Sequence, residues 1–178
     1  MKQLLLLLFV ISTLGSQAQN TENKLRPFYY LIGSYDVKVF APDESGNWQP
    51  DGSGQSTYSL LFDSTYIDEN FVLNLSNATM TMRSTLGVDG RTKELRLIAM
   101  DKEYSTMDVY DGKAEGRKLV LSNLDSDEGF QTQNAGKISF KLTVWPSEKC
   151  HHELLVEYTN DGGNTWKKFS KHEYYLKS

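Results

Sequence analysis

Short stretches of alternating polar and apolar residues, separated by turn residues, fill most of the chain after residue 35. In one of them Tyr58, Leu60 and Phe62 alternate with Thr57 and Ser59. A two-residue period of this kind is typical of β-strands that bury one face. A packed helix would need a sustained stripe with a period of 3.6 residues, and the sequence contains none. The pattern therefore predicts an all-β protein.

Ten strands are predicted from this pattern, after a short helical turn at 27–32. They cover residues 35–40, 55–62, 66–75, 79–88, 93–100, 104–110, 118–124, 138–145, 150–159 and 165–176. Residues 41–54, rich in Pro, Gly, Asp and Ser, are expected to form a loop, and Asp89-Gly90 a tight hairpin turn. The short links favour antiparallel neighbours in up-and-down order. Because closure removes exposed sheet edges, we expect a barrel, with a sandwich as the alternative.

The N-terminus has the pattern of a secretory signal peptide over residues 1–18. Lys2 is followed by an apolar run at 4–11, and Ser16-Gln17-Ala18 suits cleavage after Ala18. The run is too short to span a bilayer, which needs about 20 apolar residues, although a retained short anchor is the alternative. We expect a flexible leader at 19–26, one domain at 27–178, and an exported protein that is periplasmic or secreted.

The charge and cysteine content limit the partners and the stabilising chemistry. Removal of residues 1–18 takes away Lys2 and leaves 160 residues with 18 basic and 23 acidic side chains, a net charge of −5. This mildly acidic chain has no basic cluster, which argues against nucleic acid and anionic membranes as partners. Cys150 is the single cysteine, so packing rather than a disulfide must hold the fold. The oligomeric state stays open.

Charges in the last two predicted strands indicate how they pair around Asp161-Gly162-Gly163. Glu157 would face Lys167 and Glu153 would face Lys171, and opposite charges across strands are stabilising. The other face is more aromatic, so we take it as the inner face. It carries Leu154, Val156, Tyr158, Trp166 and Tyr174, with His152 opposite His172.

The predicted register places His152 and His172 side by side within the barrel, with Cys150 one step along. Two imidazoles and a thiol with this spacing can bind zinc or copper. The same residues can instead form a plain polar lining of neutral, hydrogen-bonded rings, or a pair that responds to pH. No cofactor is identified by the sequence.

Motifs of known enzyme classes are missing from the sequence. There is no Gly-x-Ser-x-Gly elbow, no His-Glu-x-x-His motif and no phosphate-binding loop. The carboxylates are spread through turns and outward strand positions. An enzyme that uses the barrel mouth for an unknown reaction is therefore kept only as an alternative.

The segment 28–35, with Leu31, Gly33 and Tyr35, resembles the opening of lipocalin-like (calycin-type) barrels. These begin with a helical turn and Leu-x-Gly-x-Trp, and here Tyr35 stands at the Trp position. The group includes lipocalins, fatty-acid-binding proteins, nitrobindins and uncharacterised exported bacterial families. The resemblance implies a barrel that holds an apolar or cofactor-like molecule, with Tyr35 at the closed end under a basic side chain such as Lys168. Comparison with nitrobindins would make His152 or His172 the counterpart of a haem ligand.

The leading hypothesis is an exported barrel that binds a small, largely apolar ligand in its cavity. The expected ligand-binding residues are Tyr58, Trp145, His152, Tyr158, Trp166, His172 and Tyr174, with Leu60, Met80 and Met82 completing the lining. Methionine and aromatic side chains suit an adaptable pocket. The alternative is an interaction or structural module with a filled core, whose contact surface would include Leu155 and Phe169.

Overall fold

The computed structural model describes residues 24–126, 130–132 and 136–178, so the predicted signal peptide and most of the leader lie outside the described residues. A short 3₁₀ helix, η1 (Arg26–Leu31), confirms the predicted helical turn. The strands are β1 (Gly33–Pro42), β2 (Trp48–Leu61), β3 (Tyr66–Leu75), β4 (Thr79–Val88), β5 (Leu95–Asp101), β6 (Thr106–Glu115), β7 (Lys118–Ser122), β8 (Phe130–Thr132), β9 (Gly136–Pro146), β10 (His152–Thr159) and β11 (Lys167–Leu176).

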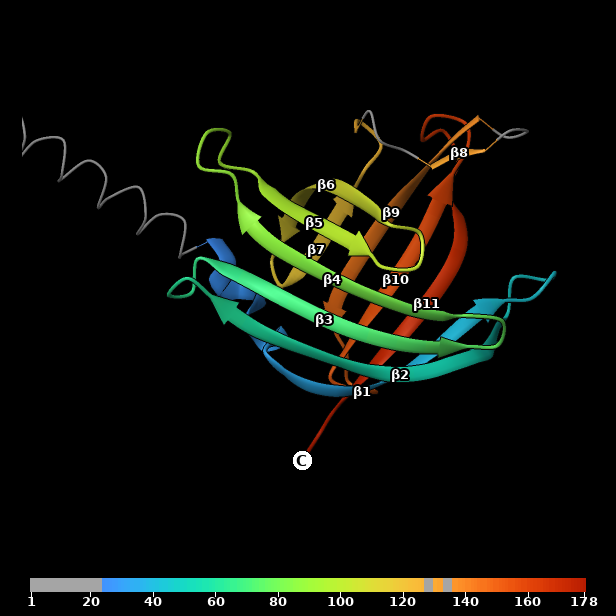
Figure 1. Cartoon of the computed structure of the whole chain (residues 1–178), viewed down its shortest axis with the longest axis horizontal. Helices are drawn as coiled ribbons and strands as arrows, with labels where there is room; N and C mark the ends of the chain where they lie inside the picture. Colours follow the sequence, from blue (N-terminus) through green and yellow to red (C-terminus); the bar gives the residue numbers. More distant parts are fainter. Residues whose placement is uncertain (1–23, 127–129, 133–135) are drawn as a thin grey trace, which may run out of the picture.

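Ten of these strands form a closed antiparallel barrel (Figure 1). Strands β1 to β7 follow one another, β9, β10 and β11 continue the sheet, and β11 pairs with β1. The short β8 pairs with β9. Closure gives each barrel strand two hydrogen-bonded neighbours, which leaves no free edge for unwanted pairing. The predicted all-β, up-and-down barrel of about ten strands is confirmed.

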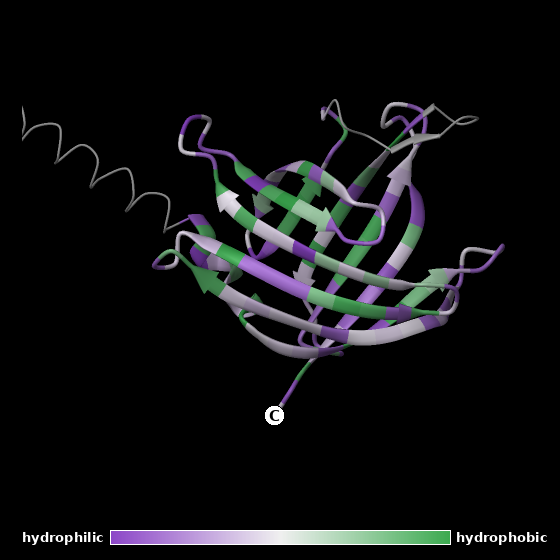
Figure 2. Ribbon diagram, in the orientation of Figure 1, coloured by the Kyte–Doolittle hydropathy of each residue, from purple (hydrophilic) through white to green (hydrophobic). Residues whose placement is uncertain are grey.

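Alternation along each strand separates an inner from an outer face. In β1, Tyr35, Val37 and Val39 are buried and the residues between them are exposed. Cross-strand pairing carries the inner face around the barrel, because Val37 lies opposite Tyr174 on one side and opposite Gly54 on the other. Figure 2 shows hydrophobic and hydrophilic residues alternating along several strands.

Helix η1 seals one end of the barrel. Leu25, Phe28 and Leu31 are fully or almost fully buried beside Tyr35. The Tyr35 hydroxyl donates a 2.9 Å hydrogen bond to the Leu31 carbonyl, which ties the helix to the start of β1. Leu25, which the sequence placed in the flexible leader, thus belongs to the packed core.

The predicted loop at 41–54 is wrong, because β1 and β2 continue through most of it and only residues 43–47 link them. Gly52 and Gly54 lie inside β2, where a Cβ atom would overlap the backbone oxygens of Asn74 and Val72 in β3. Glycine at these positions permits close approach of two strands rather than a turn. The predicted tight turn at Asp89-Gly90 is also wrong, since the link is a loop over residues 89–94.

The predicted register of the last hairpin is wrong too. His152 lies opposite Tyr174, and Glu157 lies opposite Lys168 after a β-bulge. Glu157 instead forms an ion pair of 2.8 Å with Lys141 of β9, while Glu153 accepts a hydrogen bond from Ser147.

The loop after β10 explains this register. Asp161 accepts hydrogen bonds from the Thr159 hydroxyl at 2.6 Å and from the Thr165 amide at 3.0 Å, which fixes a loop longer than the predicted turn. Each cross-strand charge pair contributes at most about 1 kcal/mol, too little to override the loop and the bulge.

Candidate binding site

Helix η1 packs into one end of the barrel; we call the other end the open end, and the inner face toward it the cup. Val39 and Leu73 are buried toward the open end, but several other inner-face apolar side chains there pack on the core and stay partly exposed. They are Met80, Met82, Phe140, Leu142 and Leu154. Toward the η1 end most inner-face apolar residues are buried, as Ile67, Leu86, Leu95 and Leu119 illustrate, although Leu60 is exposed and Leu97 is partly exposed. Met80, Met82, Phe140, Leu142 and Leu154 form the walls of the candidate site.

A carboxyl group, Glu69 of β3, lies between the walls and the sealed end. Its Oε1 accepts hydrogen bonds from the hydroxyls of Ser56 at 2.8 Å and Tyr174 at 3.3 Å, and its Oε2 accepts one from Ser84 at 3.3 Å. Tyr58 is a further hydrogen-bond partner. Burial raises the pKa of Glu69 and outweighs the opposing effect of these hydrogen bonds. We call Glu69, Ser56, Ser84 and Tyr174, together with His172, the polar floor.

His172 adds an unpartnered nitrogen to the polar floor. Its Nε2 lies 3.2 Å from the Ser170 hydroxyl, while its Nδ1 is buried and has no hydrogen-bond partner among the described residues. Burial lowers the pKa of the ring to about 4, so His172 is neutral at pH 7. A neutral ring with one free nitrogen can exchange a hydrogen bond with a bound molecule.

His152 lies deeper, near the sealed end, and does not pair with His172. Its ring stacks on Tyr174 at a centroid distance of 4.1 Å and meets Tyr35 edge-on at 4.9 Å. Burial, helped by the neighbouring His151, lowers its pKa to about 3. Neither His152 nor His172 therefore titrates near neutral pH in the folded chain.

The thiol of Cys150 is directed to the backbone, where it donates a hydrogen bond to the His152 carbonyl. Among the described residues, no three His, Cys, Asp or Glu side chains are grouped to hold a metal ion.

An aromatic group lines the rim of the cup at the β9, β10 and β11 side. The bulge in β11 turns Phe169 toward Phe140 and Tyr158, with ring centroids 5.5 Å and 6.2 Å apart. The expected outer strip of Leu155 and Phe169 does not form, because Leu155 lies opposite Lys171 instead. Phe169 thus extends the inner wall.

Two of the expected ligand-binding residues lie outside the cup. Trp145 is opposite Glu153 on the outer face, because its neighbour Val144 points into the core. Trp166 belongs to the loop before β11, and its ring lies 4.5 Å from the Lys141 ammonium on the outer face. Tyr58, His152, Tyr158, His172 and Tyr174 do lie on the inner face, where their role in binding stays a prediction.

Lys168 does not lie at the closed end, where Arg117 is one of the basic residues. The Arg117 guanidinium lies 4.8 Å from the ring of Tyr30, which follows Tyr29 in η1. Lys168 lies toward the opposite end, where it donates to the Gly46 carbonyl and sits over Trp48. The expected place of Tyr35 at the sealed end agrees with the structure.

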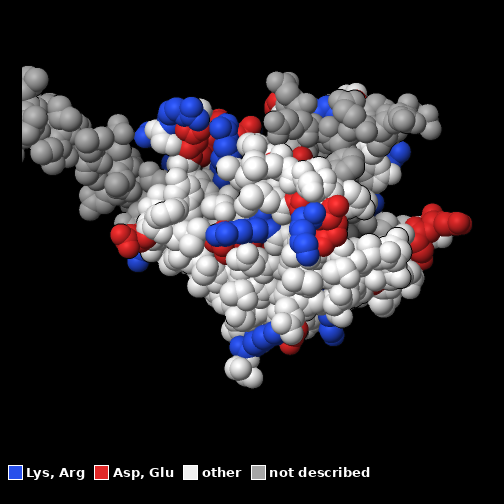
Figure 3. All heavy atoms as spheres, in the orientation of Figure 1, with Lys and Arg blue, Asp and Glu red and all other residues white. Residues whose placement is uncertain are grey.

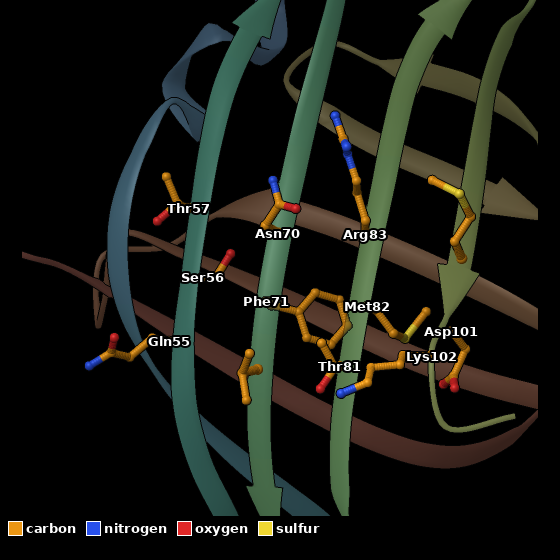
Figure 4. Close-up of a pocket in the computed structure, with 12 residues that line it drawn as sticks. Gln55, Ser56, Thr57, Asn70, Phe71, Thr81, Met82, Arg83, Asp101 and Lys102 are labelled. Atoms are coloured by element: carbon orange, nitrogen blue, oxygen red, sulfur yellow. The ribbon is translucent and has the colours of Figure 1, made fainter. Parts of the chain in front are cut away.

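A groove of about 590 Å³ lies on the outer surface of strands β2 to β5 (Figure 4). Two outer rows flank it: Thr57, Asn70, Arg83 and Met100 in one, and Gln55, Val72, Thr81 and Lys102 in the other. Ser56, Phe71, Met82 and Asp101 lie between the rows and also line it. On this side of the barrel, charged side chains are separated by wide uncharged areas (Figure 3). The groove is a shallow feature of the outer face, so the inner cup remains the candidate site.

The sequence analysis missed Glu69, Ser56 and Ser84 as a group. The available signal was the alternation of Ile67, Glu69, Phe71 and Leu73 on one face of a predicted strand. A carboxyl group in an otherwise apolar inner row is costly unless it is hydrogen-bonded or has a functional role.

No protein-family model and no curated protein matches this chain. In the part of the chain that the structure describes, no helix has the length and hydrophobicity needed to cross a membrane.

Proposed function

We propose that the protein is an exported, lipocalin-like barrel that binds a small, largely apolar molecule without covalent attachment. The observation that carries this proposal is the partial exposure of apolar side chains on the inner face, including Met80, Met82 and Phe140. A barrel with a filled core would bury such residues, because each fully buried side chain of this kind contributes about 1.5–3 kcal/mol. A ligand covering them recovers part of that free energy.

The chemistry of the cup suits a molecule with one polar end. Methionine and aromatic side chains adapt to varied apolar shapes, and a few convergent polar groups fix orientation. Here Met80, Met82 and Phe169 supply apolar walls, while Glu69 and His172 supply polar contacts at the floor. An apolar chain would therefore lie along the walls with its polar end toward the floor.

The lipocalin-like assignment is supported by three features together. The barrel is closed and antiparallel, η1 seals one end, and Tyr35 of the Leu-x-Gly-x-Tyr opening packs at that sealed end. Export is supported by the signal pattern at 1–18. Mass spectrometry of the protein recovered outside the cytoplasm tests it, and we expect a mature N-terminus at Gln19.

Binding is tested with N-phenyl-1-naphthylamine, a neutral fluorescent probe that brightens in apolar surroundings, and its displacement by 1-dodecanol. A matched pair of variants locates the site: Met80→Gln alters an inner wall, and Met107→Gln alters the exposed outer face. Loss of one apolar side chain from the wall predicts about tenfold weaker binding in Met80→Gln and unchanged binding in Met107→Gln.

Two outcomes would overturn the proposal. The first is no saturable probe binding by the wild-type chain, and the second is equal weakening in both variants. The probe signal is preferred to intrinsic tryptophan fluorescence, because Trp145 and Trp166 lie outside the cup.

A further inference from the structure

The charged residues on the inner face are almost all acidic. Pairing places Glu69 of β3, Asp101 of β5 and Asp108 of β6 on this face, because they lie opposite the inner residues Ser84, Met82 and Ala99. Lys167, opposite Tyr158 at the rim, is the one basic residue that the register places there among the described strand residues. A bound molecule would therefore meet negative charge and no cation near the floor.

Glu69 is the carboxyl that most needs a positive partner. Glu69 is 7% exposed, and its hydrogen bonds come from the neutral hydroxyls of Ser56, Ser84, Tyr174 and Tyr58. No Lys or Arg of the described chain forms an ion pair with it. Elsewhere the chain does pair its buried carboxylates: Asp68 on the outer face bonds Arg83, and Glu173 bonds Lys149 and Lys171.

His172 is a second, independent indication of a ligand at this level. Its buried Nδ1 has no hydrogen-bond partner among the described residues, and His172 as a whole is 6% exposed. When Nε2–H donates to Ser170, Nδ1 is free to accept a hydrogen bond. When Nε2 instead accepts from the Ser170 hydroxyl, Nδ1–H is a donor, so in either tautomer this nitrogen needs a polar partner that a bound molecule can supply.

We infer that the cup takes a cationic amphiphile, with a protonated amine at the polar floor and an apolar chain along the walls. This inference rests on the proposed binding function and specifies its ligand class. An ammonium group pairs with Glu69 in its ionised form, so the ligand supplies the charge that the barrel lacks. A fatty acid would place a second carboxyl group beside Glu69, and the two could both ionise only against their mutual repulsion.

The test uses three probes with the same twelve-carbon chain: dodecylammonium, 1-dodecanol and dodecanoate. Each competes with N-phenyl-1-naphthylamine at pH 7 and about 150 mM salt, below its micellar concentration. At this ionic strength the Debye length is about 8 Å, so attraction by distant surface charges is screened. The wild-type chain is expected to bind dodecylammonium about tenfold or more tightly than dodecanol, and dodecanoate most weakly. This comparison needs no variant and thus no assumption about folding.

Two charge-neutralising variants locate the preference. In Glu69→Gln, the amine and the alcohol should bind with nearly equal affinity, while dodecanol binding stays close to wild type. Glu115→Gln removes one exposed carboxylate from the outer face of β6 and should leave the amine preference intact. It controls for attraction of the amine by the net negative charge of the chain.

The possible failures are distinguishable. If dodecanol or dodecanoate binds as tightly as dodecylammonium, or if the preference survives in Glu69→Gln, the cationic ligand class is refuted and the binding function stands. If none of the three probes displaces the fluorophore, the proposed function fails together with this inference.

Discussion

The contrast between the sealed and the open end predicts unequal costs for removing two phenylalanines. Phe28 in η1 is 0% exposed, whereas Phe169 at the rim is 49% exposed. Phe28→Ala leaves a cavity in packed core and should cost about 3–5 kcal/mol of unfolding free energy. Phe169→Ala removes a side chain already half in water. Because full burial is worth about 1.5–3 kcal/mol, its loss should cost about 1 kcal/mol.

Urea unfolding followed by far-ultraviolet circular dichroism measures both variants. A domain has about 5–15 kcal/mol of stability, so Phe28→Ala stays folded without denaturant when the wild type lies above the low end of this range. Probe affinity should show the opposite order of effects: a clear loss in Phe169→Ala and little change in folded Phe28→Ala. Equal stability losses, or a loss of 3 kcal/mol or more in Phe169→Ala, would refute the division of the barrel into a packed end and a binding end.

Three further changes test single contacts. Burial raises the pKa of Glu69 above its unfolded value of about 4.3, so ionisation lowers the stability of the wild-type chain as pH rises through the folded-state pKa. In urea unfolding, the free energy of unfolding of the wild type, relative to that of Glu69→Gln, should fall between pH 4 and pH 8. A difference between the two proteins that stays constant with pH would contradict this. Tyr35→Phe removes the buried hydrogen bond to the Leu31 carbonyl, and calorimetry should show a loss of about 1–1.5 kcal/mol. Gly87→Ala would place a Cβ against the ring of Tyr66 and should cost about 1–3 kcal/mol, with part of the loss recovered in Gly87→Ala/Tyr66→Ala; an additive double variant would count against that contact.

Local patterns were sufficient to predict the strands, because alternation reports directly on which residues are buried. The alternation of Met80, Met82 and Ser84 predicted one face of β4, and these residues do lie on its inner face. Glycine misled the prediction at 41–54. Gly52 and Gly54 occur in a turn-like composition, and only the three-dimensional approach of β3 explains them.

The site was harder to predict because it depends on register. Two charge pairs were used to align β10 with β11, yet Glu157 found Lys141 on the other neighbouring strand. Sequence cannot show such competition between neighbours before the barrel order is known. Trp166 was assigned inward for the same reason, although the Asp161 loop carries it outside.

Methionine methyl NMR tests the central claim most directly. The predicted mature chain has four methionines: Met80 and Met82 on the inner wall, and Met100 and Met107 on the outer face. Titration of [methyl-¹³C]methionine-labelled protein with dodecylammonium should shift the Met80 and Met82 signals and leave Met100 and Met107 in place. Shifts confined to Met100 and Met107, or no saturable shift at all, would contradict binding inside the cup.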